Sequence, residues 1–466
     1  MQDLETLPTE VIDLTPDDLD ERVLELLEDG HFEELRILLA DQYSQDIADV
    51  LERLDDPTER YAVFSQLQPD VAADVLIEVS RYTARKLLQR MPAPVAGSLL
   101  HRMEMDDLVE ILADELEDRQ DEILAQMHPS TAKEIRDLLN YPENSAGRLM
   151  TRKFVKVNQD MTAAEIIAFL RRTNERYETI TDIYVTDPAN RLIGVASLRQ
   201  VIMEKPGAQI KEFMEREPET ILPTATAEEA ARHLGRYDFL ALPVVTPDDK
   251  MLGIITVDDA IDVLTAAQTE DMLGIGGLPG EASAAPYFTV PIMRVIRQRF
   301  VWLILLFIGG SITAQVLHLF QDELSVVVAL SFYIPLLIGT GGNTGSQTVT
   351  MIIRGMTIND IRQSDLLRVI RRELISGMIL GALLGVVAFL RVILQEGSGN
   401  PLPFVVAAAV IAVCAWSNVI AAVIPMFARR FKIDPALISA PLISTTVDAT
   451  GLLIYMLIAK AVLDAI

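Results

Sequence analysis

Five long apolar stretches near the C-terminus constrain the fold of this chain more than any other feature. They cover about residues 300–320, 325–353, 374–395, 403–428 and 435–463. About 20 helical residues cross the hydrocarbon core of a bilayer, so each stretch is long enough to span a membrane. The sequence therefore predicts an all-α, five-helix transmembrane domain within residues 299–466.

The residues before these stretches have a different character. Residues 1–290 contain 58 acidic and 27 basic side chains, whereas residues 291–466 contain 9 and 13. This asymmetry indicates two environments, and the acidity points to cations and argues against a nucleic-acid partner. The alternative is that the negative charge only keeps this region in solution. The single cysteine, Cys414, excludes a disulfide within the chain.

Basic residues beside the predicted spans indicate their direction. Three arginines precede the first span within 294–299, five lie between the second and third within 354–372, and three basic residues lie between the fourth and fifth within 429–432. The connections on the other side contain a single arginine, Arg391. By the positive-inside rule, the N-terminus is cytoplasmic and the C-terminus lies outside. The acidic N-terminus does not resemble a secretory signal.

Residues 1–140 read as an acidic domain of short helices. Similar units recur, as in QDIADVL, QPDVAADVL and HPSTAKEIRDLL. Pro69 and Pro129 stand where a first helical turn tolerates proline. Stacked helical hairpins, forming an all-α superhelical domain, are the expected outcome.

The segment 141–264 contains an internal duplication. LMTRKFVKVNQDMTAAEI resembles FMEREPETILPTATAEEA, and IYVTDPANRLIGVASL resembles PVVTPDDKMLGIITV. The two copies cover about 145–205 and 210–264, and each alternates helix with β-branched strands, an α/β pattern. The equivalent positions are Met150 and Met214, Thr162 and Thr226, and Gly194 and Gly253.

This duplication resembles a tandem of CBS domains, a family of regulatory modules. The second copy contains Gly253, Thr256 and Asp259 as G-x-x-T-x-x-D, which in some CBS modules holds the ribose of a nucleotide. The first copy has Gln200 in place of the aspartate, so the resemblance implies a single nucleotide site. The alternative is that the motif forms a turn and caps the next helix.

Residues 251–290, which run from the end of the duplication to the basic flank of the first span, contain no Lys or Arg. Asp259, Asp262, Glu270 and Asp271 are spread over the predicted helix of this segment without basic partners. Clustered carboxylates repel one another unless cations bridge them, and hard cations do this best. We predict a regulatory metal site here, continuing into a connecting helix and linker at 265–298. A solvated acidic helix is the alternative.

Asp448 lies in the middle of the last predicted span. A charge in lipid costs at least about 2.5 kcal/mol on insertion scales, so this residue should face a polar interior or an aqueous path. Ser444 and Thr445 add oxygen atoms, and Asn343, Ser346 and Gln347 add uncharged ligands from GTGGNTGSQT in the second stretch. One carboxylate with neutral oxygens suits Mg²⁺, which usually keeps several waters. A hydrogen-bonded packing aspartate and a helix interface of small residues are the alternatives.

Two enzyme classes find no support in the sequence. No G-x-x-x-x-G-K-[ST] motif for an ATP-driven pump occurs, and an intramembrane aspartyl protease needs two facing carboxylates where the spans offer one. We therefore expect no enzymatic activity.

The whole arrangement resembles the MgtE family of Mg²⁺ transporters. The most specific segments are PLLIGTGGNTGSQ (335–347) and PALISAPLISTTVDATG (435–451). The resemblance implies a homodimeric, multi-pass, Mg²⁺-selective uptake channel in the bacterial cytoplasmic (inner) membrane, with Asp448 of both subunits contacting a hydrated ion. It also implies that the connecting helix is a plug whose four acids bind Mg²⁺ and hold the pore closed, and that ATP can bind the CBS pair. A proton-coupled carrier of Mg²⁺ or Co²⁺, or a Mg²⁺ sensor without transport, are the open alternatives.

Overall fold

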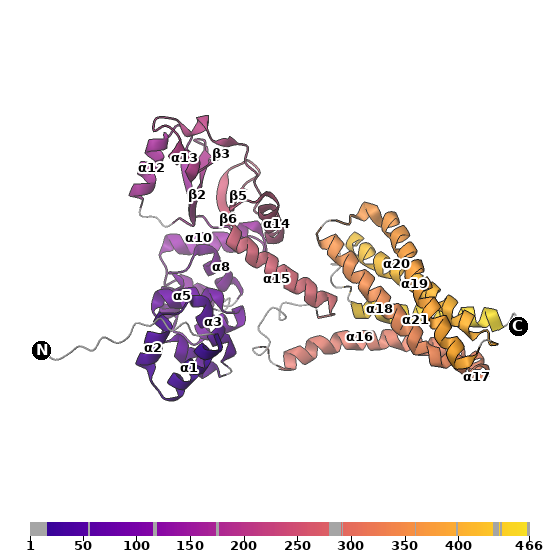
Figure 1. Ribbon diagram of the computed structural model, residues 1–466. Coiled ribbons are helices and arrows are strands. Elements are labelled where there is room, and N and C mark those ends of the chain that lie inside the picture. The colour runs from indigo at the N-terminus through magenta and orange to yellow at the C-terminus, as the bar shows by residue number, and fades with distance from the viewer. Residues whose placement is uncertain are drawn as a thin grey trace. The chain divides into compact units, whose positions relative to one another are not determined.

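The computed structural model (Figure 1) has two units, called here unit 1, which ends at Ala267, and unit 2, which begins at Gln268. Residues 279–289 of the predicted linker and residues 435–437 of the last predicted span lie outside the described residues. The described residues are 16–54, 56–114, 119–173, 177–278, 290, 292–358, 360–397, 399–431, 438 and 440–463.

The first part of unit 1 is a stack of short helices. They are α1 (Pro16–Glu28), α2 (Phe32–Ala40), α3 (Ser44–Arg53), α4 (Pro57–Phe64), α5 (Pro69–Glu78), α6 (Arg81–Gln89), α7 (Ala93–Leu100), α8 (Met105–Asp114), α9 (Gln120–Leu124), α10 (Pro129–Leu139) and α11 (Ala146–Leu149). Alternate helices contact one another, α3 on α5 and α5 on α7 in one layer, α4 on α6 and α6 on α8 in the other. Pro69 and Pro129 begin α5 and α10. The predicted helical superhelix is confirmed.

The second part of unit 1 contains both copies of the duplication. Its elements are β1 (Phe154–Asn158), α12 (Ala163–Arg172), β2 (Thr179–Thr186), β3 (Leu192–Ser197), α13 (Leu198–Met203), the 3₁₀ turn η2 (Ile210–Glu212), β4 (Glu215–Arg216), α14 (Ala227–Tyr237), β5 (Ala241–Val245), β6 (Met251–Thr256) and α15 (Val257–Ile275). A mixed sheet has the order β1-β2-β3-β4, with β1 and β2 parallel, and β5 and β6 form a hairpin. The predicted α/β class is confirmed.

The equivalent positions of the two copies make equivalent contacts. The side chains of Thr162 and Thr226 each accept a hydrogen bond from a backbone N–H at the start of α12 and α14, so both are helix caps. A Cβ on Gly194 would lie 2.5 Å from Met214 Sδ of the second copy, and a Cβ on Gly253 would lie 2.9 Å from Met150 of the first. Each copy therefore supplies the methionine that covers the glycine of the other.

Unit 2 is helical. Its helices beyond α15 are α16 (Ile292–Leu319), α17 (Gln321–Val326), α18 (Ala329–Thr357), α19 (Leu366–Glu396), α20 (Leu402–Arg430) and α21 (Ala440–Leu463), with a 3₁₀ turn η4 (Gln363–Asp365). Among the described residues, four helices are long and apolar enough to cross a membrane: α16, α19 together with the preceding turn η4, α20 and α21. The second predicted span corresponds to α18, which continues through GTGGNTGSQT.

Glycines set the spacing of α19 and α20. A Cβ on Gly377 would lie 2.7 Å from Ala415 Cα, and a Cβ on Gly381 would lie 2.7 Å from Ile411 Cα. Such distances exclude any larger side chain, so this stripe lets the two helices approach closely, as small residues do in membrane helix pairs. The polar residues beside the stripe are thereby brought together.

Candidate functional site

The carboxyl group of Asp448 lies between α21 and α18. A Cβ on Gly342 would be 3.6 Å from Asp448 Oδ1 and 3.2 Å from Ser444 Oγ, so the missing side chain leaves the backbone of α18 beside the carboxylate. Ser444 Oγ and Ser346 Oγ are 3.2 Å apart. None of the described residues gives Asp448 a hydrogen bond or an ion pair. A half-buried carboxylate among hydroxyls, without a protein partner, is available to a cation.

The other residues predicted to line the pore fall into two groups. Ser444 shares the site with Asp448, whereas the hydroxyl of Thr445 donates to the Pro441 carbonyl at 2.9 Å and its methyl group faces Gly309 of α16. Asn343 and Gln347 are exposed on one face of α18. Ser346, which the sequence indicates as an uncharged ligand together with Asn343 and Gln347, joins the site through its contact with Ser444.

In unit 1, carboxylates gather where three segments meet. Oxygens of Glu104, Asp106 and Asp107 lie within 4.8 Å of one another before and in the first turn of α8. Glu178, just before β2, and Asp259, in α15, act electrostatically on the same acids. With Asp262, which adds its charge to that around Asp107, these residues form the carboxylate cluster: Glu104, Asp106, Asp107, Glu178, Asp259 and Asp262.

Burial and mutual repulsion favour the protonated forms of this cluster. Burial raises the pKa of Asp106, which is 7% exposed, to about 6. Burial, followed by repulsion from Asp106, raises the pKa of Asp259 to about 7 and that of Asp107 to about 8. Burial, together with Glu104, raises the pKa of Glu178 as well. Near neutral pH the cluster therefore holds protons that a bound cation would displace.

One oxygen of the cluster fits a metal ion in particular. Glu178 Oε2 is buried and has no hydrogen-bond partner in the part of the chain that the structure describes. A buried acceptor without a donor costs roughly 1–3 kcal/mol, and a cation would satisfy it. Lys153, an exposed side chain, exerts a favourable charge effect on Asp106. Carboxylate oxygens of this kind suit Mg²⁺ or another hard cation.

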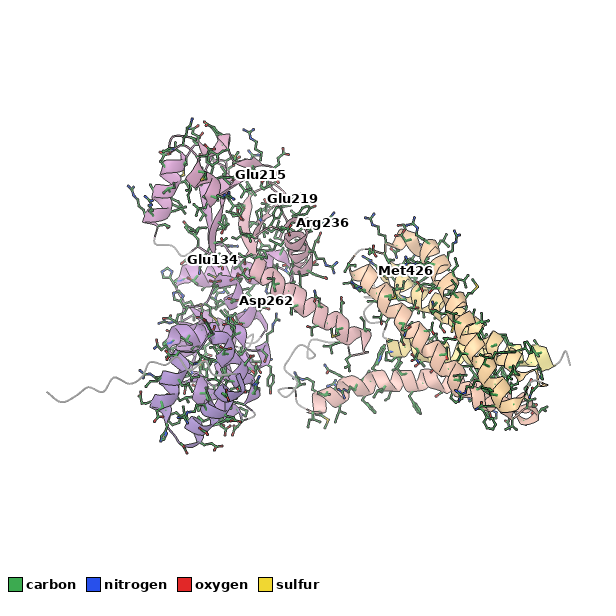
Figure 2. The ribbon with its side chains drawn as sticks, viewed as in Figure 1. Glu134, Glu215, Glu219, Arg236, Asp262 and Met426 are labelled. Atoms are coloured by element: carbon green, nitrogen blue, oxygen red, sulfur yellow. The ribbon has the colours of Figure 1, made fainter. Side chains whose placement is uncertain are left out.

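The four acids predicted to be regulatory lie in different units. Asp262 projects from the first turns of α15 (Figure 2), and partial burial of its carboxyl group, followed by repulsion from Asp258, raises its pKa. Glu270 and Asp271, further along α15, belong to unit 2. There Ile275 packs against the apolar cluster that includes Val349. The structure thus groups only Asp259 and Asp262 with the cluster.

The predicted nucleotide motif is committed to contacts within the protein. The hydroxyl of Thr256 donates to Asp259 Oδ2 at 2.8 Å, and a Cβ on Gly253 would lie 2.6 Å from the Thr151 carbonyl oxygen. Gly253 therefore serves close backbone packing, and Asp259 faces other carboxylates.

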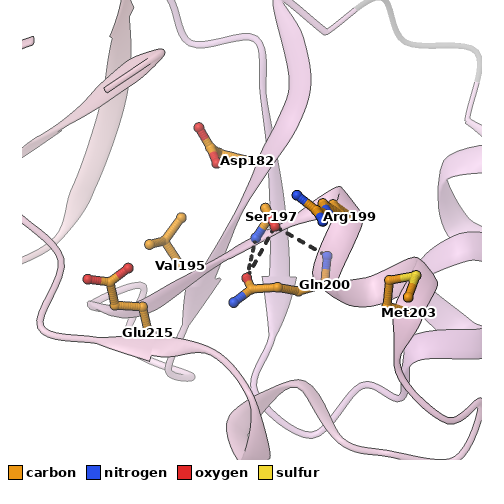
Figure 3. Close-up of a pocket in the computed structure, with 7 residues that line it drawn as sticks. All are labelled: Asp182, Val195, Ser197, Arg199, Gln200, Met203 and Glu215. Carbon is orange, nitrogen blue, oxygen red and sulfur yellow. Dashed lines mark hydrogen bonds between the residues drawn. The ribbon is translucent and has the colours of Figure 1, made fainter. Parts of the chain in front are cut away.

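A cavity of about 440 Å³ lies instead at the first copy (Figure 3), with Asp182, Glu215 and Arg199 among its lining residues. Gln200 also lines it, and its side-chain oxygen accepts from the Ser197 N–H at 2.8 Å in a capping box. The side chain that replaces the motif's aspartate is thus used to cap α13.

Sequence reasoning missed four members of the cluster: Glu104, Asp106, Asp107 and Glu178. A weak signal existed, because the chain reads GluMetAspAsp at the start of α8 and no basic residue follows within that helix. Nothing in the sequence placed Glu178, about 70 residues away, beside them.

Family models match most of the chain. The MgtE model, described as "Divalent cation transporter", matches residues 334–458, the "MgtE intracellular N domain" matches 42–144, and the CBS domain model matches 146–207 and 210–266. The "Magnesium transporter MgtE" of Thermus thermophilus is 36% identical over 95% of this chain and 98% of its own length. That of Bacillus subtilis is 31% identical over 98% of this chain and 100% of its own length.

Among solved structures, "Crystal structure of the cytosolic domain of the Mg2+ channel MgtE in complex with ATP" is 33% identical and covers 52% of this chain and 99% of that one, with a TM-score of 0.49.

Proposed function

Because the chain belongs to the MgtE family of magnesium transporters, we propose that it moves Mg²⁺ across a membrane through unit 2 and is closed by Mg²⁺ bound to its acidic residues. The relatives are named as transporters, and no enzymatic reaction is part of the proposal. Asp448 carries the transport step, since its half-buried carboxylate faces a glycine backbone and has no partner among the described residues.

The ion at Asp448 is proposed to keep most of its water. Mg²⁺ binds reluctantly without water and is commonly held by one or two carboxylates. In the proposed homodimer, Asp448 of both subunits supplies two negative charges, and Ser444 and Ser346 hydrogen-bond the bound waters. Asn343 and Gln347, exposed on α18, are proposed to line the path in the dimer, and Thr445 to line it less directly.

Closure is proposed to be a population shift. Without Mg²⁺ the carboxylate cluster repels itself or takes up protons, and with Mg²⁺ it is bridged, so that one arrangement of unit 1 is favoured. Asp259 and Asp262 start α15, and Glu270 and Asp271 continue it, so this helix is proposed to be the plug. Cytoplasmic residues 1–298 and an outer C-terminus complete the proposal, in a bacterial inner membrane.

We also propose the domain limits 1–140, 141–264, 265–298 and 299–466. ATP is proposed as a secondary ligand of the CBS pair. The sequence motif Gly253, Thr256 and Asp259 supports it by resemblance, while the cavity beside Arg199 offers space at the other copy. Binding at the motif requires Thr256 and Asp259 to leave their mutual hydrogen bond.

The test is Mg²⁺ uptake into liposomes containing the wild-type protein or Asp448→Asn, which keeps the size and removes the charge. Glu396→Gln, an exposed change at the end of α19, is the control. We expect uptake with the wild type and the control and almost none with Asp448→Asn. Equal uptake by all three would contradict the role of Asp448. No uptake by any would favour a sensor.

A proton-coupled carrier is separated by electrical recording. A channel gives a reversal potential that follows the Mg²⁺ gradient alone, and a coupled carrier gives one that shifts with the pH gradient. We expect the first result.

A further inference from the structure

We propose that Glu373 and Asn418 form a polar clamp that positions α18 for ion passage. The clamp rests on the proposed transport function but does not itself bind the ion. It lies within unit 2, where α20 contacts both α18 and α19.

A single buried amide makes the clamp. Asn418, on α20, is 1% exposed. Its Oδ1 accepts a hydrogen bond from Thr348 Oγ1 of α18 at 3.0 Å, and its Nδ2 donates to Glu373 Oε2 of α19 at 3.2 Å and to the Glu373 carbonyl at 3.3 Å. Both ends of the amide are therefore used. Through it, the rotation of α18 is tied to the position of α19.

The glycine stripe of α19 makes this reach possible. Gly377 follows Glu373 by one helical turn, and a Cβ there would lie 2.8 Å from the Cys414 carbonyl oxygen. Asn418 follows Cys414 by one turn of α20, so the close approach at Gly377 places Glu373 opposite Asn418 in an antiparallel pair. A wider spacing would separate the carboxylate from the amide.

The clamp acts on the helix that borders Asp448. Thr348 lies six residues after Gly342, or about 9 Å along α18 at 1.5 Å per residue. A rotation of α18 would turn the bare backbone of Gly342 away from Asp448 and separate Ser346 from Ser444. The neighbouring Ser417 does not link these helices, because its buried hydroxyl makes no hydrogen bond with any described residue. Thr344 and Cys414 offer only a 3.9 Å contact to sulfur.

The test exchanges the two partners. Asn418→Asp places two acceptors face to face and should lower Mg²⁺ flux in proteoliposomes at least about tenfold. Glu373→Gln combined with Asn418→Asp reverses the side-chain hydrogen bond and keeps the total charge, although the bond to the backbone carbonyl of residue 373 stays lost, so flux should return to within about threefold of the wild type. Thr348→Val, which removes one bond only, should cost about threefold. Glu396→Gln on the same helix is the control.

A second measurement reads the position of α18 without transport. The double variant Ser346→Cys with Ser444→Cys should cross-link readily, because the two serine hydroxyls are 3.2 Å apart. Asn418→Asp should slow the reaction and the exchanged pair should restore its rate. If Asn418→Asp does not reconstitute as a monodisperse protein, Thr348→Val carries the comparison.

Wild-type flux in Asn418→Asp, or an exchanged pair as poor as the single variant in both assays, would overturn the clamp. Restored cross-linking without restored flux would assign Glu373 to the ion itself and also overturn it. A wild type without flux whose cross-linking still depends on Asn418 would reject the proposed function and leave the clamp standing.

Discussion

The carboxylates of unit 1 and of unit 2 have opposite surroundings. The cluster of unit 1 brings six together, with pKa values of Asp106, Asp259 and Asp107 raised to about 6, 7 and 8. Unit 2 surrounds one, Asp448, with hydroxyl groups and a glycine backbone. Many charges in one place respond steeply to a cation because each unpaired charge strains the others. A lone charge binds weakly enough to release an ion. In the proposed function, the first arrangement serves to sense Mg²⁺ and the second to let it pass.

Crowding the lone carboxylate gives the largest expected effect. Gly342→Ala puts a Cβ 3.2 Å from Ser444 Oγ, and overpacking of this kind costs about 1–3 kcal/mol, so Mg²⁺ flux should fall roughly ten- to a hundredfold. The Mg²⁺ concentration that closes the protein should not change. Gly339→Ala is the control, because nothing lies within 4 Å of its added Cβ. Uptake into proteoliposomes measures the Mg²⁺ flux. Similar flux in Gly342→Ala and Gly339→Ala would contradict the role given to the space beside Asp448.

Low pH should weaken Mg²⁺ binding at the carboxylate cluster more than it lowers Mg²⁺ flux past Asp448. The cluster must lose protons to bind Mg²⁺, and its raised pKa values mean that protons are held up to about pH 8. Apparent Mg²⁺ affinity for closure should therefore rise about tenfold from pH 6 to pH 8. In the absence of Mg²⁺, the free energy of unfolding should change with pH in the opposite direction. The folded state holds more protons than the unfolded state, so the protein loses stability as pH rises from about 4 to 8. Protease protection at several Mg²⁺ concentrations checks both signs, and a flat pH profile would contradict the cluster.

Removing charge from the cluster should have opposite effects with and without Mg²⁺. Asp107→Asn with Asp259→Asn relieves repulsion, so the Tm without Mg²⁺ should rise by about 2–4 °C. The same variant lacks two ligands, and its Mg²⁺ midpoint should rise about fivefold. Asp121→Asn, whose side chain is 97% exposed, is the control. A lower Tm of this variant without Mg²⁺ would show that repulsion among these carboxylates does not destabilise the folded state.

The smallest expected effect concerns the positive charge of Lys153. Lys153→Met removes a positive charge that favours ionised Asp106, and with it a competitor for Mg²⁺, so the midpoint for closure should fall about twofold. Lys156→Met is the matched control, because Lys156 donates to Asn190 at 2.8 Å. A midpoint that rises would assign Lys153 to stabilising the cluster.

The sequence predicted best those features that depend on neighbours along the chain. Apolar length predicted the helices of unit 2, and the duplication predicted that Thr162 and Thr226 are equivalent, as their matching helix caps confirm. The carboxylate cluster needed contacts between α8, the start of β2 and α15, and no local pattern carries that information. The same holds for Glu373, which lies at the edge of a predicted span and gains its partner Asn418 only through the packing at Gly377.

The crossed contacts, Gly194 under Met214 and Gly253 under Met150, mean that neither copy of the duplication is complete alone. A chain cut between them would leave an uncovered glycine and an uncovered thioether on each half.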